Sequence, residues 1–86
     1  MKFTPDVELD TLGLICPYPI IETSKLIKQI DDGSLLAISA DDRAILLDMP
    51  AWCHSNGHEY LGHEDLNNKK GYIVYVRKRN KIVSED

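Results

Sequence analysis

Long apolar segments are absent from this sequence of 86 residues. No stretch approaches the roughly 20 apolar residues of a membrane-spanning helix, and residues 1–6 lack the apolar core of a secretory signal peptide. We therefore expect a cytoplasmic protein with no membrane span. Positive charge is also scarce, because 10 Lys and Arg residues stand against 14 Asp and Glu, for a formal net charge of −4. Nucleic-acid binding needs clustered cations, so we expect no direct nucleic-acid partner and interpret the basic run at residues 77–81 as a solvated strand end.

Cysteine is nearly absent as well, since the chain has only Cys16 and Cys53. Thiols stay reduced in the cytosol, so the pair does not predict a structural disulfide. Each cysteine is then either an inert buried side chain or a chemically active one. Cys53 follows Trp52 in an apolar stretch and is expected to be a packed thiol. The histidines are His54, His58 and His63. They show no His-Glu-x-x-His pattern, so we expect surface histidines, no metal site and no cofactor.

The spacing of apolar residues predicts one small α/β domain. Alternating or short apolar runs bounded by turn residues predict four strands, at residues 7–12, 34–40, 59–66 and 72–77. Apolar residues three and four apart predict one helix at residues 17–30 and a second that follows Asp41 or Asp42 as N-cap and ends at Asn56-Gly57. Both helices are expected on one face of a four-stranded mixed sheet, which gives a two-layer βαβαββ sandwich. Residues 1–79 then form a single domain with a frayed start at residues 1–6, and residues 80–86 form a disordered tail.

The stretch Gly13-Leu14-Ile15-Cys16-Pro17-Tyr18-Pro19 joins the first strand to the first helix. Pro17 suits the first helical position, where a missing N–H costs nothing. A residue before proline adopts the extended backbone that an N-cap needs, so we predict Cys16 at the N-cap with its sulfur near the backbone N–H of Tyr18. The helix dipole at that point favours the thiolate, which is the nucleophilic form. We accordingly predict that the pKa of Cys16 lies below the reference value of about 8.5.

A structural interpretation of the same stretch stays open. Free cysteine is often a small buried hydrophobe, and spacing alone does not decide between burial and reactivity at Cys16. Pro19 disfavours helical backbone at Tyr18, so we expect an irregular first turn with few N–H donors. Asp10 is interpreted either as an acceptor that holds the loop or as an ordinary turn carboxylate. Tyr18 is interpreted as an exposed side chain suited to contact with a partner.

The motif residues resemble those of a known family. Residues 10–19, Asp-Thr-Leu-Gly-Leu-Ile-Cys-Pro-Tyr-Pro, are similar to the opening motif of the TusA/SirA-like sulfur-carrier proteins, in which Asp, Gly-Leu and Cys-Pro-x-Pro recur. The likeness continues through residues 32–33, 40–42, 48–53 and 57–58. It covers residues 7–78, which is more evidence than a short motif gives alone. The resemblance implies the two-layer βαβαββ fold and sulfurtransferase activity as a protein sulfur carrier.

For this chain the resemblance implies that Cys16 is the catalytic residue, which accepts sulfane sulfur as a persulfide and relays it. The residues that shape its turn are Asp10, Gly13, Pro17, Tyr18 and Pro19. The implied partners are a sulfur-donor protein, either a cysteine desulfurase or rhodanese-like, and a sulfur-acceptor protein. Family members serve tRNA thiolation, molybdenum-cofactor synthesis, and sulfur oxidation or thiosulfate use. Some tRNA-thiolation members have a basic residue where this chain has Ile15, which weakens that assignment and leaves other relays open.

Two other functions stay open from the sequence. One is a non-catalytic regulatory or protein-interaction module on the same fold, with Cys16 kept as a structural N-cap. The other is a thiol redox protein in which Cys16 reacts with Cys53, which requires their Cα atoms to lie within about 7 Å of each other. Capping and solvation account for the remaining carboxylates near the second helix, which are Asp41, Asp42 and Asp48.

Overall fold

The computed structural model describes residues 3–15, 17–66 and 70–79. Within these ranges the elements are β1 (Val7–Asp10), α1 (Tyr18–Ile27), β2 (Leu35–Ala40), α2 (Ile45–Asn56), β3 (Glu59–Asp65) and β4 (Tyr72–Arg77). Their order confirms the predicted βαβαββ sequence of elements. The tail predicted at residues 80–86 lies outside the described residues.

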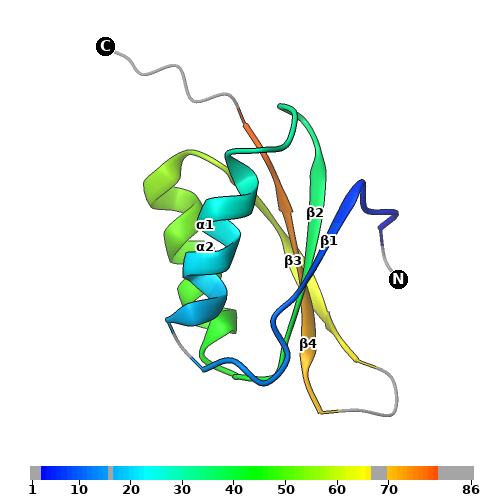
Figure 1. The fold of residues 1–86 in the computed structure, drawn as a ribbon, viewed down its shortest axis with the longest axis vertical. Helices are drawn as coiled ribbons and strands as arrows, with labels where there is room; N and C mark the ends of the chain where they lie inside the picture. The colour runs from blue at the N-terminus through cyan, green and yellow to red at the C-terminus, as the bar shows by residue number, and fades with distance from the viewer. Residues whose placement is uncertain (1–2, 16, 67–69, 80–86) are drawn as a thin grey trace.

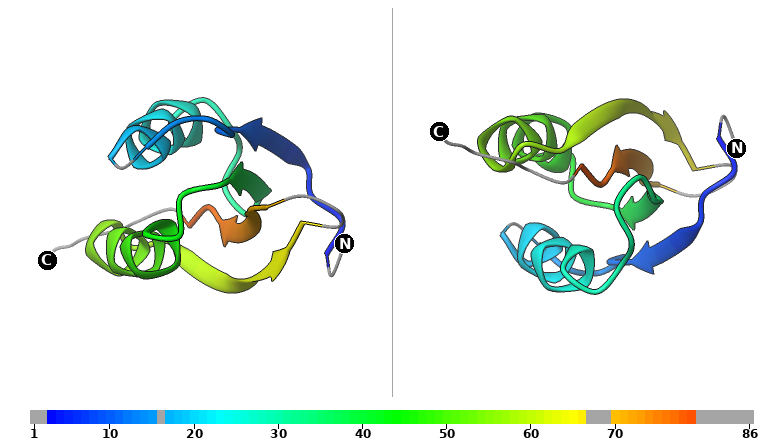
Figure 2. Two further views of the ribbon diagram at one scale, coloured as in Figure 1. Left: turned by 90° about the horizontal axis from the view of Figure 1, so that it is seen from below. Right: turned by 90° about the horizontal axis from the view of Figure 1, so that it is seen from above.

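The strands form one mixed sheet in the order β1-β2-β4-β3. β1 runs parallel to β2, whereas β4 runs antiparallel to both β2 and β3. The β3–β4 pair is the predicted hairpin, and its register shifts between Tyr60 and Gly62. Both helices lie on the same side of the sheet, as Figures 1 and 2 show. The predicted two-layer sandwich is therefore confirmed.

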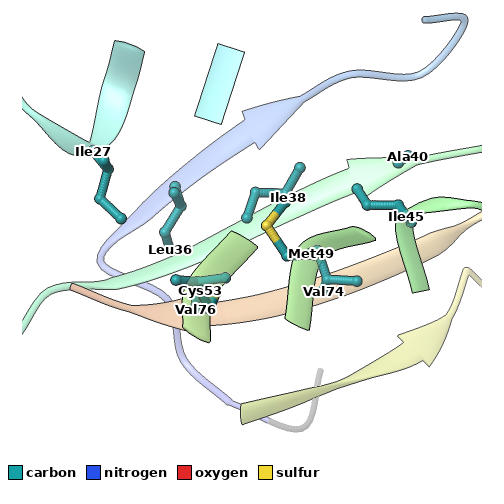
Figure 3. Close-up of a cluster of buried hydrophobic side chains, with 9 residues drawn as sticks. All are labelled: Ile27, Leu36, Ile38, Ala40, Ile45, Met49, Cys53, Val74 and Val76. Atoms are coloured by element: carbon teal, nitrogen blue, oxygen red, sulfur yellow. The ribbon is translucent and has the colours of Figure 1, made fainter. Parts of the chain in front are cut away.

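The main core lies between this helical layer and the sheet (Figure 3). α2 contributes Ile45, Met49 and Cys53, whose four-residue spacing places them on one face of the helix. α1 buries Pro19, Thr23 and Ile27 at the same spacing. β2 lies inside the sheet and is buried along nearly its whole length. Its short apolar run predicted this burial.

A second cluster covers the face of the sheet that points away from the helices. It consists of Leu35, Ala37, Ile73 and Tyr75, with Phe3, Leu61 and Leu66 packed against them. The Phe3 ring meets the Tyr75 ring edge-on, with 4.9 Å between centroids. The Asp6 carboxylate also accepts the Leu35 N–H at 2.8 Å. The predicted frayed start is therefore wrong for residues 3–6, because the chain end supplies apolar cover that the sheet face needs.

The helix ends follow local chemistry with small shifts from the predicted boundaries. α1 ends at Ile27, three residues before the predicted end. Gly57 ends α2 as predicted, in a left-handed conformation with φ 78°, and the Cys53 carbonyl accepts the N–H of His58 at 2.9 Å. The N-cap position of α2 is Ala44, which corrects the prediction of Asp41 or Asp42. Asp42 instead lies two residues before this N-cap residue, and its carboxylate accepts the Ala44 N–H at 3.0 Å.

Among the described residues, neither helix combines the length and the apolar character needed to cross a bilayer.

Candidate functional site

The Cys-Pro-x-Pro stretch lies at the end of the molecule where both helices begin. β1 and β2 are parallel and each is followed by a helix, so the first turns of α1 and α2 lie beside the carboxyl ends of these strands (Figure 1). We call residues 11–15 and Pro17 the motif loop. Cys16, the candidate catalytic residue, sits between its two parts and itself lies outside the described residues. Its neighbours are open to solvent, since Ile15 is 67% exposed and Pro17 is exposed.

Backbone and side-chain hydrogen bonds hold the first half of the motif loop. Thr11 is buried, and both its backbone N–H and its hydroxyl donate to the Ser39 carbonyl of β2, at 2.8 and 2.6 Å. The Asp10 carboxylate accepts the Leu12 N–H at 2.9 Å. A carboxylate that accepts the N–H two residues further on forms an Asx turn, so this bond restrains the start of the loop and is also that of an ordinary turn carboxylate.

A second carboxylate reaches the motif loop from the neighbouring connection. Asp41 Oδ2 accepts the Gly13 N–H at 2.9 Å, and Asp41 directly follows the end of β2. Gly13 has φ 86°, in the left-handed region that glycine adopts without strain. The loop before Cys16 is therefore fixed by Asp10 on one side and Asp41 on the other. Sequence reasoning missed the role of Asp41, although its place after a strand parallel to β1 was a usable signal.

The start of α1 differs from the predicted arrangement. Pro17 is the N-cap residue, with φ −100° and ψ 16°, and the helix begins at Tyr18. The prediction of Cys16 as N-cap and Pro17 as first helical residue is therefore wrong by one position. The Tyr18 N–H donates to the Ile15 carbonyl at 2.8 Å, so this donor is already used within the loop. Tyr18 is helical although the Pro19 that follows disfavours helical backbone there, so the irregularity expected from Pro19 is not found at Tyr18.

Pro19 has a structural role that the sequence did not reveal. It lies in the first turn of α1 and is buried. The hydroxyl of Thr23, which is fully buried, donates to the Pro19 carbonyl at 2.8 Å. This buried hydrogen bond stabilises the first turn of α1 on its core side. Tyr18, in the same turn, is 52% exposed. Of the described motif residues, Pro19 is therefore anchored in the core, whereas Pro17 and Tyr18 face solvent.

Two more carboxylates lie beside this first turn. A small hollow between the helices is lined by Pro19 and Ile20 of α1 and by Asp42, Ile45 and Asp48 of α2 and its lead-in. The turn of α1 that follows Cys16 therefore faces carboxylates from the second helix. These groups oppose a thiolate, whereas the N-terminus of α1 favours it.

Cys53 is a core residue, as predicted. Its side chain is 1% exposed, and burial raises the pKa of the Cys53 thiol from about 9 to about 12. A thiol of this kind stays protonated at neutral pH and is a poor nucleophile. This placement disfavours the redox function in which Cys53 would react with Cys16.

His58 and His63 make separate ring contacts. His58 stacks on Trp52 with 5.3 Å between ring centroids, and His63 meets the Tyr72 ring edge-on at 6.1 Å. Across the residues that the structure describes, no three metal-binding side chains come together.

The chain is thus a small two-layer domain with a Cys-Pro-x-Pro stretch at the junction of β1 and α1. The family model for "Sulfurtransferase TusA" matches residues 7–78, and the chain belongs to this family. It is 47% identical to the Bacillus subtilis "Putative sulfur carrier protein YrkF" over all of its own length but only 44% of that relative's. It is 38% identical to "Putative sulfur carrier protein YrkI" of the same organism, over 70% of this chain and 80% of that protein.

A solved structure shows the same fold. The crystal structure of a SirA-like protein from Desulfitobacterium hafniense matches with a TM-score of 0.73, at 17% identity, over 86% of this chain and 99% of that one. At this identity the likeness concerns the fold alone. It agrees with the two helices on one face of a four-stranded mixed sheet seen here.

Of the predicted site residues, the structure brings together Asp10, Gly13, Pro17, Tyr18 and Pro19 at one end of the domain. The residues that sequence reasoning missed are Thr11, Thr23 and Asp41. Thr11 and Asp41 act through hydrogen bonds to backbone 28 positions away, which no local pattern specifies. Thr23 instead donates to the carbonyl four residues earlier in its own helix.

Proposed function

We propose that this chain is a sulfur carrier that accepts sulfane sulfur on Cys16 as a persulfide and relays it to an acceptor protein. The observation that carries the proposal is the motif Cys16-Pro17-Tyr18-Pro19 at the junction of β1 and α1, in a chain of the TusA family. The exposure of Ile15, Pro17 and Tyr18 on either side of Cys16 supports it, because a relay residue must be reached by two different proteins in turn.

The proposed transfer needs no cofactor and no net oxidation. The Cys16 thiolate attacks the outer sulfur of a donor persulfide, R–S–SH. A new S–S bond forms to Cys16 while the donor's own S–S bond breaks, and the donor leaves as its thiolate. The product is a Cys16 persulfide, and the reverse reaction at an acceptor thiol returns Cys16 to its starting state. The donor is proposed to be a cysteine desulfurase or a rhodanese-like protein.

The loop geometry is suited to this exchange. Asp10 and Asp41 fix the backbone before Cys16, and Thr23 fixes the turn after it through the Pro19 carbonyl. A thiol carried on restrained backbone loses little conformational freedom when a partner docks. The hollow next to the first turn of α1, lined by Pro19, Ile20 and Ile45 among others, is small, which fits a sulfur delivered by another protein.

Mass spectrometry tests the proposal directly. The reduced chain is incubated with inorganic polysulfide, or with a cysteine desulfurase and cysteine, and then digested. The expected result is an added mass of about 32 Da on the peptide that contains Cys16, removed by dithiothreitol and absent in Cys16→Ala. Sulfur on Cys53 only, or on neither cysteine with any donor, would overturn the proposal and favour an interaction module.

A further inference from the structure

The large apolar side chains that this fold leaves exposed gather near Cys16. In the described ranges they are Leu12, Ile15, Tyr18, Ile21 and Leu47. The first four flank Cys16 in sequence, and Leu47 lies in the first turn of α2, at the same end of the molecule (Figure 1). Leu47 is 80% exposed and therefore contributes almost nothing to the core. Exposed apolar side chains concentrated at one site mark an interaction surface.

Four carboxylates lie at the same end of the domain as these apolar side chains. Asp10 and Asp41 bind the motif loop on the strand side, while Asp42 and Asp48 lie beside Pro19 and Ile20 on the helix side. Two cations lie close to these carboxylates, because Arg43 directly follows Asp42 in the sequence and Lys70 lines a hollow together with Asp41. We call the five apolar side chains together with these four carboxylates the docking face.

The described cations of the C-terminal basic run, Arg77, Lys78 and Arg79, lie at the opposite end of the domain. Arg77 pairs in register with Leu35, the first residue of β2, whereas the motif loop lies beyond the last residues of β1 and β2. Arg77 and Arg79 bind the Glu59 carboxylate, at 3.8 and 2.7 Å. Lys78 donates to the Ile30 carbonyl at 2.6 Å. Arg77, Lys78 and Arg79 are therefore engaged within the chain, away from the docking face.

We propose that the docking face binds a sulfur-donor protein that presents its sulfane sulfur on an apolar surface rimmed by lysine and arginine. This inference rests on the proposed function, and it specifies the partner's surface. The apolar centre supplies burial around the transferring sulfur, and the carboxylate rim selects partners of opposite charge and speeds their association. Leu47 extends the contact from the motif to α2, so recognition does not depend on the Cys-Pro-x-Pro residues alone.

Titration calorimetry with two donors tests this proposal. The full chain carrying Cys16→Ser, which prevents covalent trapping, is titrated with a cysteine desulfurase and separately with a persulfide-loaded rhodanese from the same organism. For the donor that binds, Leu47→Ser is expected to raise Kd about tenfold and Tyr18→Ala about thirtyfold. Tyr18→Phe keeps the ring and is expected to restore most of the affinity. Asp48→Asn is expected to raise Kd several-fold at low salt and to reduce the salt dependence of binding.

Control variants separate docking from folding and from sulfur chemistry. Asp31→Asn removes an exposed carboxylate at the opposite end and is expected to leave Kd unchanged. Urea midpoints unchanged in Leu47→Ser establish that the variant is folded. Equal Kd values for wild type, Leu47→Ser and Tyr18→Ala, or no binding to either donor, would overturn the proposal. A dimer in ultracentrifugation that Leu47→Ser dissociates would also overturn it, because a second copy of the chain would then cover the face.

Failure of the docking-face proposal can be distinguished from failure of the proposed sulfur-carrier function. A chain that gains sulfur on Cys16 from polysulfide but binds neither donor is a carrier without this docking face. A chain that binds a donor through Leu47 and Tyr18 but never gains sulfur has the docking face without the carrier function. The two readouts, Kd and the mass of the Cys16 peptide, therefore fail independently.

Discussion

Asp41 and Gly13, which are 28 positions apart in the sequence, are joined by a hydrogen bond of 2.9 Å from the Gly13 N–H to Asp41 Oδ2. Gly13 precedes Cys16 by three residues, and Asp41 follows β2. The connection that leads into α2 therefore helps to set the backbone that leads to Cys16. Such a contact is possible only because β1 and β2 run parallel and end side by side.

Loss of this bond is expected to loosen the motif loop. In Asp41→Ala the Gly13 N–H loses its acceptor, and a typical net hydrogen-bond contribution of about 1 kcal/mol predicts amide exchange about fivefold faster at Gly13. Asp41→Asn keeps an acceptor oxygen and is expected to exchange close to the wild-type rate. NMR hydrogen exchange at fixed pH measures both, with Asp31→Asn as a distant control. Identical exchange at Gly13 in all variants would show that Asp41 does not hold the loop.

A lowered pKa of Cys16 remains a prediction, and one of the two physical causes first given for it no longer applies. The Tyr18 N–H is bonded to the Ile15 carbonyl, which leaves the N-terminus of α1 as the remaining cause of a lowered pKa. We expect the rate of iodoacetamide alkylation to report a pKa below about 8.5. Because Cys53 is buried, the native chain is expected to react at one thiol, and Cys16→Ala at none. A Cys16 pKa at or above that reference value would mean that the nearby carboxylates outweigh the helix.

The burial of the Cys53 thiol is expected to make the folded chain less stable in alkaline solution. Burial raises the pKa of its thiol from about 9 to about 12 in the folded chain. The folded state therefore holds this proton more tightly, so the contribution is complete below pH 9 and is lost as pH rises from 9 towards 12. The free energy of unfolding is expected to fall by about 1.4 kcal/mol per pH unit in that range.

Denaturation in urea at a series of alkaline pH values measures this slope. Cys53→Ala is expected to be less stable at neutral pH, because it leaves a cavity in the core, but to lose less stability above pH 9. Tyr60 also titrates in this range, since burial and the nearby Cys53 raise its pKa. Tyr60→Phe is therefore the matched control, and the Cys53-dependent part of the slope is expected to persist in it. An unchanged slope in Cys53→Ala would contradict the assignment.

Two glycines provide a matched test of backbone strain. Gly33 and Gly71 both have positive φ, 84° and 139°. A Cβ at Gly33 would meet no atom within 4 Å, whereas one at Gly71 would lie 2.9 Å from the Ala40 carbonyl oxygen. Gly33→Ala is expected to cost about 1 kcal/mol of stability, and Gly71→Ala about 3 kcal/mol because strain and a backbone clash add. Urea denaturation compares the two, and an equal cost would rule out the clash at the β2–β4 pair.

Local patterns in the sequence determined much of the fold. The apolar run of β2, the four-residue spacing of Ile45, Met49 and Cys53, and Gly57 after α2 each specify an element or its end through contacts within a few residues. The burial of Cys53 follows from the same spacing. These features were predictable because strand and helix periods repeat along the chain itself.

The tertiary structure decided what surrounds Cys16. Asp41 reaches Gly13, Phe3 covers Tyr75, and the first turns of α1 and α2 share one end, because parallel pairing of β1 with β2 brings distant segments together. The burial of Pro19 in the first turn of α1 was also decided there. Sequence spacing encodes short-range periods, whereas hydrogen bonds and burial between distant segments depend on how the strands pair. The motif could therefore be recognised from the sequence, whereas the surface around it could not be predicted.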